Sequence, residues 1–461
     1  MTKVLVYGID GAPPELIFGE WLGELPNIKA LMEKGCYARI NSTIPPATII
    51  AWSAFASGKD ASQIGVFGHT IRDEKTNKTH LVNSSHVKTS RIWDILGKHS
   101  KKSIILNVPL TYPVKPINGI MVSGFLTPSI ESRCAYPEGV KEKIKKLGNT
   151  EIYFDVAELA GYKDMDINEL LKKTYEMTEM QAGLLKELAA NEEWDFLMQV
   201  FIGTDRLQHM LWRHFDKTHR RFIKNSPHKN ALKDYYKYLD KNLGETLKLL
   251  DKDTVVIVTS DHGMTKQEGK ININNWLIEK GYLVLKDWFK EEINHNKCKI
   301  NFEGIDWEKT TAYATGAYHA RIFINRKKTE DYEKTREKLI EEIKQIKDDK
   351  GSRLKTEIFK AEEIYAEPSN PECPDLTVYF DELRWASNPD FGIKGLHSWE
   401  TAMGADNAGH SKQGSFVIAG KGIKPKGNIG EVSIYQATPT ILKILGVQAP
   451  KDIRHEPMGV F

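Results

Sequence analysis

The sequence predicts an α/β protein in which a parallel-rich central sheet is flanked by helices and carries an inserted α+β cap. Short apolar runs, such as Val255-Val256-Ile257-Val258, are typical of buried strands in a parallel sheet. Such runs alternate with helical patterns, among them a long amphipathic stretch over 167–190, as expected for βα units. Between about 270 and 400 the pattern changes to short strands and a charged helix, which indicates the cap.

The 461 residues allow one large domain with insertions or two to three domains. We assign 1–128, 166–269 and 401–461 to the core and 270–400 to the cap subdomain. The segment 129–165 has weaker periodicity, so we treat it as a further insertion. The 40% hydrophobic content and 10 tryptophans suffice for a large core.

The composition excludes several classes of function. Lys+Arg 65 against Asp+Glu 62 gives a net charge of +3, so no nucleic acid polymer is expected as a partner. No apolar run is long enough for a membrane span, and the first residues already predict a strand rather than a signal peptide. The four cysteines lie far apart and form no CxxC pair, which fits a reducing compartment. We therefore expect a cytoplasmic protein, whose oligomeric state the sequence does not give.

The core elements follow from local patterns. Pro26 precedes and Gly35 follows a predicted helix over 27–34, and Gly446 ends a helix over 436–445. Pro45 and Pro46 disfavour a helix before Ala47, so a helix can begin near Thr48. Strands are predicted at 3–8, 103–109, 119–122, 196–202, 255–259 and 415–419, and further helices at 90–99 and 231–250. In the cap, strands are predicted at 311–314 and 320–325 and a helix at 332–347.

Several of these elements end in residues that bind metals. Asp261-His262 follows the strand at 255–259, where open α/β sheets bind ligands, and Asp10 follows the first strand. Asp205 and His209 are four apart and share one helix face. Each has an ordinary alternative: a polar turn at Asp10 or Asp261, or a surface pair at Asp205 and His209.

Thr48 and His410 complete the set. Thr48 lies near a predicted helix N-terminus, where free N–H groups favour an anion, so its hydroxyl is either an N-cap or a nucleophile. A lone histidine such as His410 is usually structural. Taken together, three carboxylates and three imidazoles suit two divalent ions of the zinc type, and a metal can ionise the threonine hydroxyl.

With these residues in place, the sequence resembles the alkaline phosphatase superfamily, and within it the type I phosphodiesterase/nucleotide pyrophosphatase group. The resemblance extends over the whole chain except the insertions. Its blocks are Gly8-Ile9-Asp10-Gly11, the segment from Thr48 to Gly65, Asp205 to His209, Ser260-Asp261-His262-Gly263-Met264, and His410 to Gly414.

The resemblance implies a ligand set and a fold. One metal would be held by Asp10, Thr48, Asp261 and His262, and the other by Asp205, His209 and His410. The implied fold is the alkaline-phosphatase-like sheet sandwiched by helices, with the cap inserted between His262 and His410. The metals would be two divalent ions, zinc or alternatively manganese.

The chain also departs from the family pattern. The nucleotide pyrophosphatases carry a phosphate-binding Asn near the position of His69 here, so either His69 or Asn107 replaces it, or the substrate differs. Related sulfatases need Cys or Ser in a Cys/Ser-x-Pro-x-Arg motif, and the residues after Thr48 do not provide it.

The expected function is that of a two-metal phosphohydrolase acting on a small phosphorylated substrate. A phosphodiesterase that works through a phosphothreonine on Thr48 is favoured. A phosphomonoesterase or phosphomutase of the same superfamily is the nearest alternative, and a non-catalytic binding module is the alternative from a different class.

Overall fold

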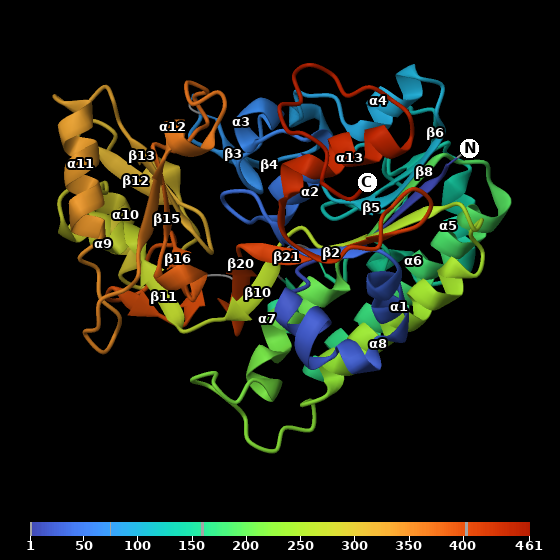
Figure 1. Ribbon diagram of the computed structural model, residues 1–461. Coiled ribbons are helices and arrows are strands. Elements are labelled where there is room, and N and C mark those ends of the chain that lie inside the picture. The colour runs from blue at the N-terminus through green and yellow to red at the C-terminus, as the bar shows by residue number, and fades with distance from the viewer. Residues whose placement is uncertain (1, 74, 158–160, 402–403) are drawn as a thin grey trace.

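The central element is a nine-stranded, mostly parallel sheet (Figure 1). The computed structural model describes residues 2–73, 75–157, 161–401 and 404–461. Five neighbouring strands, β9, β1, β8, β5 and β6, run parallel, whereas β21 is antiparallel to β9 and β7 to β6. The spatial order is β22 (Gly427–Ser433), β2 (Cys36–Asn41), β21 (Gln413–Ala419), β9 (Val255–Thr259), β1 (Val4–Ile9), β8 (Phe196–Phe201), β5 (Ser103–Val108), β6 (Gly119–Ser123) and β7 (Ala135–Tyr136).

Helices cover both faces of this sheet, which confirms the predicted fold class (Figure 1). One face carries α1 (Pro26–Lys34), α5 (Val140–Leu147), α6 (Ile167–Asn191), α7 (Gly203–Phe215) and α8 (Ala231–Leu247). The other carries α2 (Thr48–Ser57), α3 (Ala61–Ile64), α4 (Ile92–Lys98) and α13 (Ala437–Ile444).

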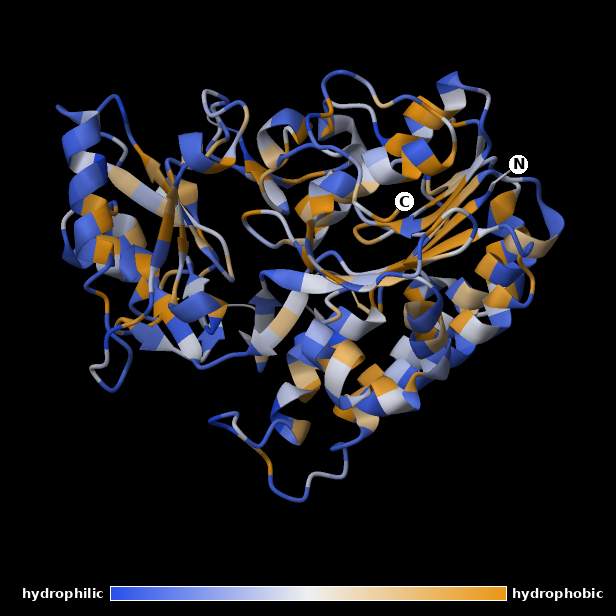
Figure 2. Cartoon of the chain, in the orientation of Figure 1, coloured by the Kyte–Doolittle hydropathy of each residue, from blue (hydrophilic) through white to orange (hydrophobic). Residues whose placement is uncertain are grey.

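The sheet forms because its central strands are apolar on both faces. Every residue of β1, β5, β8 and β9 is buried, so these strands can only be satisfied between two helical layers. Figure 2 shows the same division, with hydrophobic strands at the centre and hydrophilic outer faces on the helices.

The cap has its own hydrophobic core, a cluster of buried residues that extends from Ile271 to Phe391. Its four-stranded antiparallel sheet has the order β12 (Ala312–Thr315), β13 (Ala320–Ile324), β15 (Leu376–Tyr379) and β14 (Glu357–Lys360). Its helices are α9 (Ile273–Glu279), α10 (Asp287–Ile293), α11 (Tyr332–Ile343) and α12 (Ala361–Ile364). The domain boundaries given above stay a prediction.

Within the described residues, four small sheets lie outside the central sheet and the four-stranded cap sheet. β16 (Trp385–Asn388), β11 (Gly269–Asn272) and β17 (His397–Ser398) form one, and the others are pairs. The pairs are β10 (Gly263–Lys266) with β20 (Ala408–Ser411), β3 (Thr70–Arg72) with β4 (Thr79–Leu81), and β18 (Glu400–Thr401) with β19 (Gly404–Ala405). Short 3-10 turns cover Leu22–Glu24, Ser84–His86, Thr150–Ile152, Gly161–Asp164, Phe302–Gly304, Asp381–Leu383 and Ile434–Gln436, and a π turn covers Glu15–Glu20.

The predicted elements differ from the structure mainly at their ends, but strands β2 and β22 of the central sheet and β14 and β15 of the cap sheet were not predicted. The helices expected over 332–347 and 231–250 end earlier, at Ile343 and Leu247. In 129–165, of which 158–160 lie outside the described residues, β7 extends the central sheet and α5 packs on α6, and weak periodicity predicted neither. Within the described residues, no helix has both the length and the apolar character needed to cross a membrane.

Candidate metal centre and active site

The predicted ligands meet at one edge of the central sheet. Strands β9, β1 and β8 are adjacent and parallel, so their carboxyl ends lie together. Asp10 directly follows β1, and Asp261 with His262 follows β9. Asp205 and His209 lie on one face of α7, which begins just after β8.

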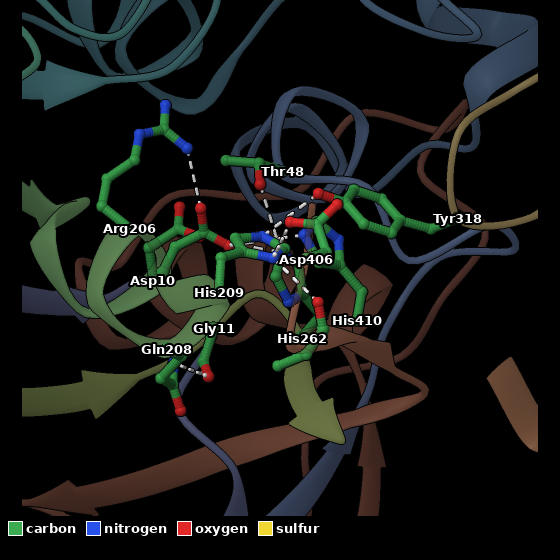
Figure 3. Close-up of polar contacts among 12 residues, drawn as sticks. Asp10, Gly11, Thr48, Arg206, Gln208, His209, His262, Tyr318, Asp406 and His410 are labelled. Carbon is green, nitrogen blue, oxygen red and sulfur yellow. Dashed lines mark hydrogen bonds and ion pairs between the residues drawn. The ribbon is translucent and has the colours of Figure 1, made fainter. Parts of the chain in front are cut away.

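Thr48 and His410 reach this edge from other elements. His410 lies in the short strand β20, which pairs with β10 so that His410 faces Met264. Thr48 is the first residue of α2, and its Oγ1 lies 3.2 Å from Nε2 of His262 (Figure 3). Ala47, not Thr48, occupies the N-cap position, so the N-cap alternative for Thr48 is wrong.

Each of the three buried aspartates has one anchored oxygen and one free oxygen. Oδ2 of Asp10 accepts from Nε1 of Trp52 at 2.7 Å, and Oδ2 of Asp205 contacts Nη1 of Arg206 at 2.7 Å. Oδ1 of Asp261 accepts from the Gly11 N–H at 3.2 Å. The other oxygens, Asp10 Oδ1, Asp205 Oδ1 and Asp261 Oδ2, are buried without a hydrogen-bond partner in the described structure.

The three histidines are oriented in the same way. Their Nδ1 atoms lie 3.0 Å from the Gly263 carbonyl for His262, 2.9 Å from the Ala408 carbonyl for His209, and 2.8 Å from the Pro46 carbonyl for His410. A carbonyl only accepts, so Nδ1 carries the proton and donates. In the neutral imidazole, Nε2 then offers its lone pair to the site.

These free atoms lie close together. The ligand atoms of Asp10, Asp261 and His262 lie within 4.8 Å of one another, as do those of Asp205, His262 and His410. His209 belongs to neither of these groups, but its Nε2 lies 3.3 Å from Oδ1 of Asp205. Buried carboxylate oxygens without partners beside imidazole nitrogens are the donor set of a transition-metal site, so the residues fit divalent metal ions.

The electrostatics of Asp10, Asp261 and His262 agree with this donor set, whereas for His209 the carboxylates of Asp205 and Asp406 outweigh burial and raise the pKa to about 9. Burial and the charge of Asp205 raise the pKa of Asp10 well above its ordinary value, and burial and Asp10 raise that of Asp261. Burial and the neighbouring His410 hold the pKa of His262 well below its ordinary value, so this imidazole is neutral. A bound cation relieves the repulsion between the carboxylates and uses the neutral imidazole as a ligand.

Two residues at the site have no local sequence signal. Tyr318, from the cap, stacks on the ring of His410 at 4.6 Å between centroids, and its hydroxyl lies 3.3 Å from Nε2 of His209 (Figure 3). Asp406 is buried, and its Oδ1 lies 3.3 Å from Nδ1 of His209. Their proximity to the histidines depends on pairings between distant segments, so periodicity could not have found them.

Asp406 also holds two buried lysines. Its Oδ2 lies 2.7 Å from Nζ of Lys163 and 3.2 Å from Nζ of Lys270. Burial alone would raise the pKa of Asp406, but the two ammonium groups hold it well below its ordinary value. Burial lowers the pKa of Lys270, so the neighbouring carboxylate is what favours its charged form. The network therefore depends on the charge of Asp406.

We expect Asp406→Asn to lower the free energy of unfolding at pH 7 by about 3 kcal/mol, because it leaves two buried lysines without a carboxylate. Since the pKa of Asp406 is depressed in the folded state, its contribution is present at neutral pH and is lost as the pH falls through that pKa. Urea unfolding of the two proteins measures the difference. The matched control is Asp349→Asn, which breaks the more exposed pair with Arg220 and should cost about 1 kcal/mol or less. Equal losses in both variants would contradict the prediction.

The two predicted substrate-binding residues lie in different surroundings. His69 is exposed, and its ring centroid lies 5.8 Å from that of Phe125. Asn107 is buried, its Oδ1 accepts from Gln199 at 3.1 Å, and its Nδ2 has no partner in the described structure. His69 is thus accessible to a substrate, whereas Asn107 lies within the core.

The fold and the Asp/His/Thr site together define an α/β phosphohydrolase of the alkaline phosphatase superfamily. Residues 4–406 match the model of the family described as type I phosphodiesterase / nucleotide pyrophosphatase, and the chain belongs to that family. The family is metal-dependent, and the two Asp/His clusters are where this chain can bind metal ions. No curated protein matches the chain in sequence.

Solved structures share the fold at low sequence identity. Human ectonucleotide pyrophosphatase / phosphodiesterase 5 superposes with a TM-score of 0.56 at 13% identity, covering 99% of this chain and 97% of its own. An inactive variant of the murine protein, in complex with AMP, gives 0.57 at 13% identity with coverages of 98% and 96%. Phosphonoacetate hydrolase from Sinorhizobium meliloti 1021, in complex with phosphonoformate, gives 0.63 at 12% identity with coverages of 97% and 96%.

Proposed function

We propose that this enzyme is a two-metal phosphodiesterase that forms a phosphothreonine intermediate on Thr48. One observation carries the proposal: the Thr48 hydroxyl, at the start of α2, faces His262 beside buried carboxylate oxygens that have no other partner. A hydroxyl placed among metal ligands can serve as a nucleophile, and the structure gives it no capping role.

The proposed ligands are divided as the family pattern implies. Asp10, Thr48, Asp261 and His262 would hold one divalent ion, and Asp205, His209 and His410 the other, with zinc or manganese as the metal. When bound, such ions lower the pKa of a coordinated hydroxyl and neutralise charge on phosphoryl oxygens. Trp52, Arg206 and the Gly11 N–H each fix one aspartate so that its free oxygen points into the site.

In the proposed reaction, the Thr48 oxygen attacks phosphorus and the leaving alcohol departs. Water then hydrolyses the phosphothreonine and frees the hydroxyl. The start of α2 supports this chemistry, because Ile50 and Ala51 are the first residues whose N–H groups bond back to Ala47. The N–H groups before them are therefore available to a phosphoryl oxygen.

A phosphodiester is favoured over a monoester because the chain belongs to the type I phosphodiesterase / nucleotide pyrophosphatase family. His69 is the better placed of the two candidate substrate contacts, because its side chain is exposed whereas that of Asn107 is buried.

We expect phosphodiesters to be cleaved faster than monoesters. A panel of aryl phosphodiesters, aryl monoesters, phosphonates and nucleotides, assayed with added zinc or manganese, measures kcat/KM for each class. The phosphonates and nucleotides belong in the panel because similar folds bind phosphonoformate and AMP. A clear preference for monoesters would move the assignment to a phosphatase or phosphomutase.

A non-catalytic binding module is disfavoured, because the chain belongs to a family of enzymes and its Asp/His/Thr set is complete. The cytoplasmic location stays a prediction. So do the identity and number of the metal ions, which elemental analysis of the purified protein would determine.

A further inference from the structure

Arg321, on cap strand β13, is a buried guanidinium with few partners. Its side chain is about nine-tenths buried, and Nη1 donates to the Phe67 carbonyl at 2.5 Å. Its Nε has no hydrogen-bond partner, and no ion pair of the described residues includes Arg321. Arginine is seldom buried without a carboxylate or another anion, because removing its charge from water is costly. Something outside the described structure is therefore expected to face it.

Arg321 lines a pocket between the cap sheet and the β3–β4 hairpin. The pocket has a cavity volume of about 60 Å³ and is partly open to solvent. Arg72 lies in the same wall, held by stacking on Trp307 at 3.8 Å from the ring centroid. The aromatic residues of the lining are Phe67, Phe302, Tyr313 and Phe323. Two arginines against one lining carboxylate, Glu372, give the pocket a net positive charge beside its aromatic residues.

The pocket contains none of the proposed metal ligands, but two chain segments connect it to them. Arg321 lies three residues after Tyr318, which stacks on His410, and β13 begins between them at Ala320. On the core side, the guanidinium packs on Gly68, where an added Cβ would lie 2.7 Å from Nη1. The next residue, His69, is the proposed substrate contact.

A buried histidine, His319, lies between Tyr318 and Arg321 in the sequence. His319 is buried, and its Nε2 has no partner among the described residues. Burial, together with Arg321 and His410, holds the pKa of His319 well below its ordinary value. Two residues between Tyr318 and the pocket, His319 and Arg321, thus each carry a buried nitrogen without a partner among the described residues.

We propose that Arg321 and Arg72 bind a second anionic group of the substrate, a carboxylate or a phosphonate-type group, through charge-assisted hydrogen bonds. The substrate is then a phosphodiester in which one esterified group carries this anion beyond an apolar or aromatic spacer. This inference rests on the proposed phosphodiesterase function and names its substrate class.

Three matched diesters test it: bis(4-nitrophenyl) phosphate, and two analogues in which one nitro group is replaced by a carboxylate or a phosphonate. The readout is the ratio of kcat/KM for each charged diester to that for the uncharged one. We expect a ratio on the order of 10–100 for the wild-type holoenzyme, because a charged hydrogen bond contributes about 1.5–3 kcal/mol. The two analogues separate a carboxylate from a phosphonate.

Four variants distinguish a specific role of Arg321 in substrate binding from effects on the activity of the enzyme as a whole. Arg321→Met should reduce the ratio to nearly one, and Arg321→Lys should keep part of it, because the charge remains. Gly68→Ala, which displaces the guanidinium without removing it, should also lower the ratio and replaces Arg321→Met if that variant fails to fold. Arg353→Met removes an exposed cap arginine bonded to Gln345 and should keep the wild-type ratio.

A wild-type ratio near one, or an equal loss on all three diesters in Arg321→Met, would overturn the subsite. If no diester is cleaved, the proposed function fails. Calorimetric titration with benzoate and phenylphosphonate then tests separately whether Arg321 forms an anion-binding subsite. Binding that weakens tenfold or more in Arg321→Met and is kept in Arg353→Met supports the subsite. Absence of binding, or equal binding in both variants, rejects it.

Discussion

Thr48→Ala should lower kcat on the best phosphodiester by on the order of 10³-fold or more. The change removes the proposed nucleophile and one proposed metal ligand together, whereas the aspartates and histidines keep their anchors. Because Thr48 caps no backbone N–H, the melting temperature of the metal-free protein should change little. The measurement is kcat on the best panel substrate, with the melting temperature of the same preparations.

Two controls make this result specific. Thr48→Ser keeps the hydroxyl and should keep most of the activity. Ser53→Ala removes another buried hydroxyl from the same helix, and that hydroxyl has no hydrogen-bond partner in the described structure, so turnover should not change. Near-wild-type turnover in Thr48→Ala would reject the phosphothreonine and leave an activated water as the attacking group.

The strands and their polar ends could be predicted because the information is local. The run Val255-Val256-Ile257-Val258 is apolar on both faces, which a parallel sheet between two helical layers requires, and Asp261 follows at once. Asp205 and His209 share a face because α7 continues past both of them. Such residues reach one site because neighbouring parallel strands end at the same edge.

The contacts that orient the ligands could not be predicted in this way. Tyr318 meets His209 across 109 positions of sequence, through a cap hairpin whose placement depends on tertiary packing. Asp406 and Lys163 are 243 positions apart, and only the folded chain makes them a buried pair. Trp52 was visible as an apolar residue on a helix, but its bond to Asp10 depends on how α2 meets β1. Local patterns thus predict the ligands, whereas long-range packing fixes their orientation.

Removal of metal should abolish activity and destabilise the fold, since both depend on the same carboxylates. Asp10, Asp205 and Asp261 each keep one buried oxygen without a hydrogen-bond partner in the described structure, and in metal-free protein the carboxylates of Asp10 and Asp261 repel each other. A ligand that binds only the folded state stabilises it by about 2.7 kcal/mol at a free concentration 100 times its Kd. We therefore expect chelation to lower the melting temperature by several degrees, and zinc or manganese to restore both stability and turnover.

The variant Asp261→Asn tests whether repulsion between the carboxylates, and not a general effect of the chelator, destabilises the metal-free protein. The carboxamide keeps an oxygen that accepts from the Gly11 N–H, but it removes one negative charge and weakens one metal ligand. The variant without metal should then be more stable than the wild type without metal, because the repulsion with Asp10 is gone. Added metal should stabilise the variant less than the wild type, so that the order of the two melting temperatures reverses. If chelation changes neither activity nor melting temperature in the wild type, and elemental analysis finds no bound metal, then the cluster is not a metal site and its carboxylates must be held by protons.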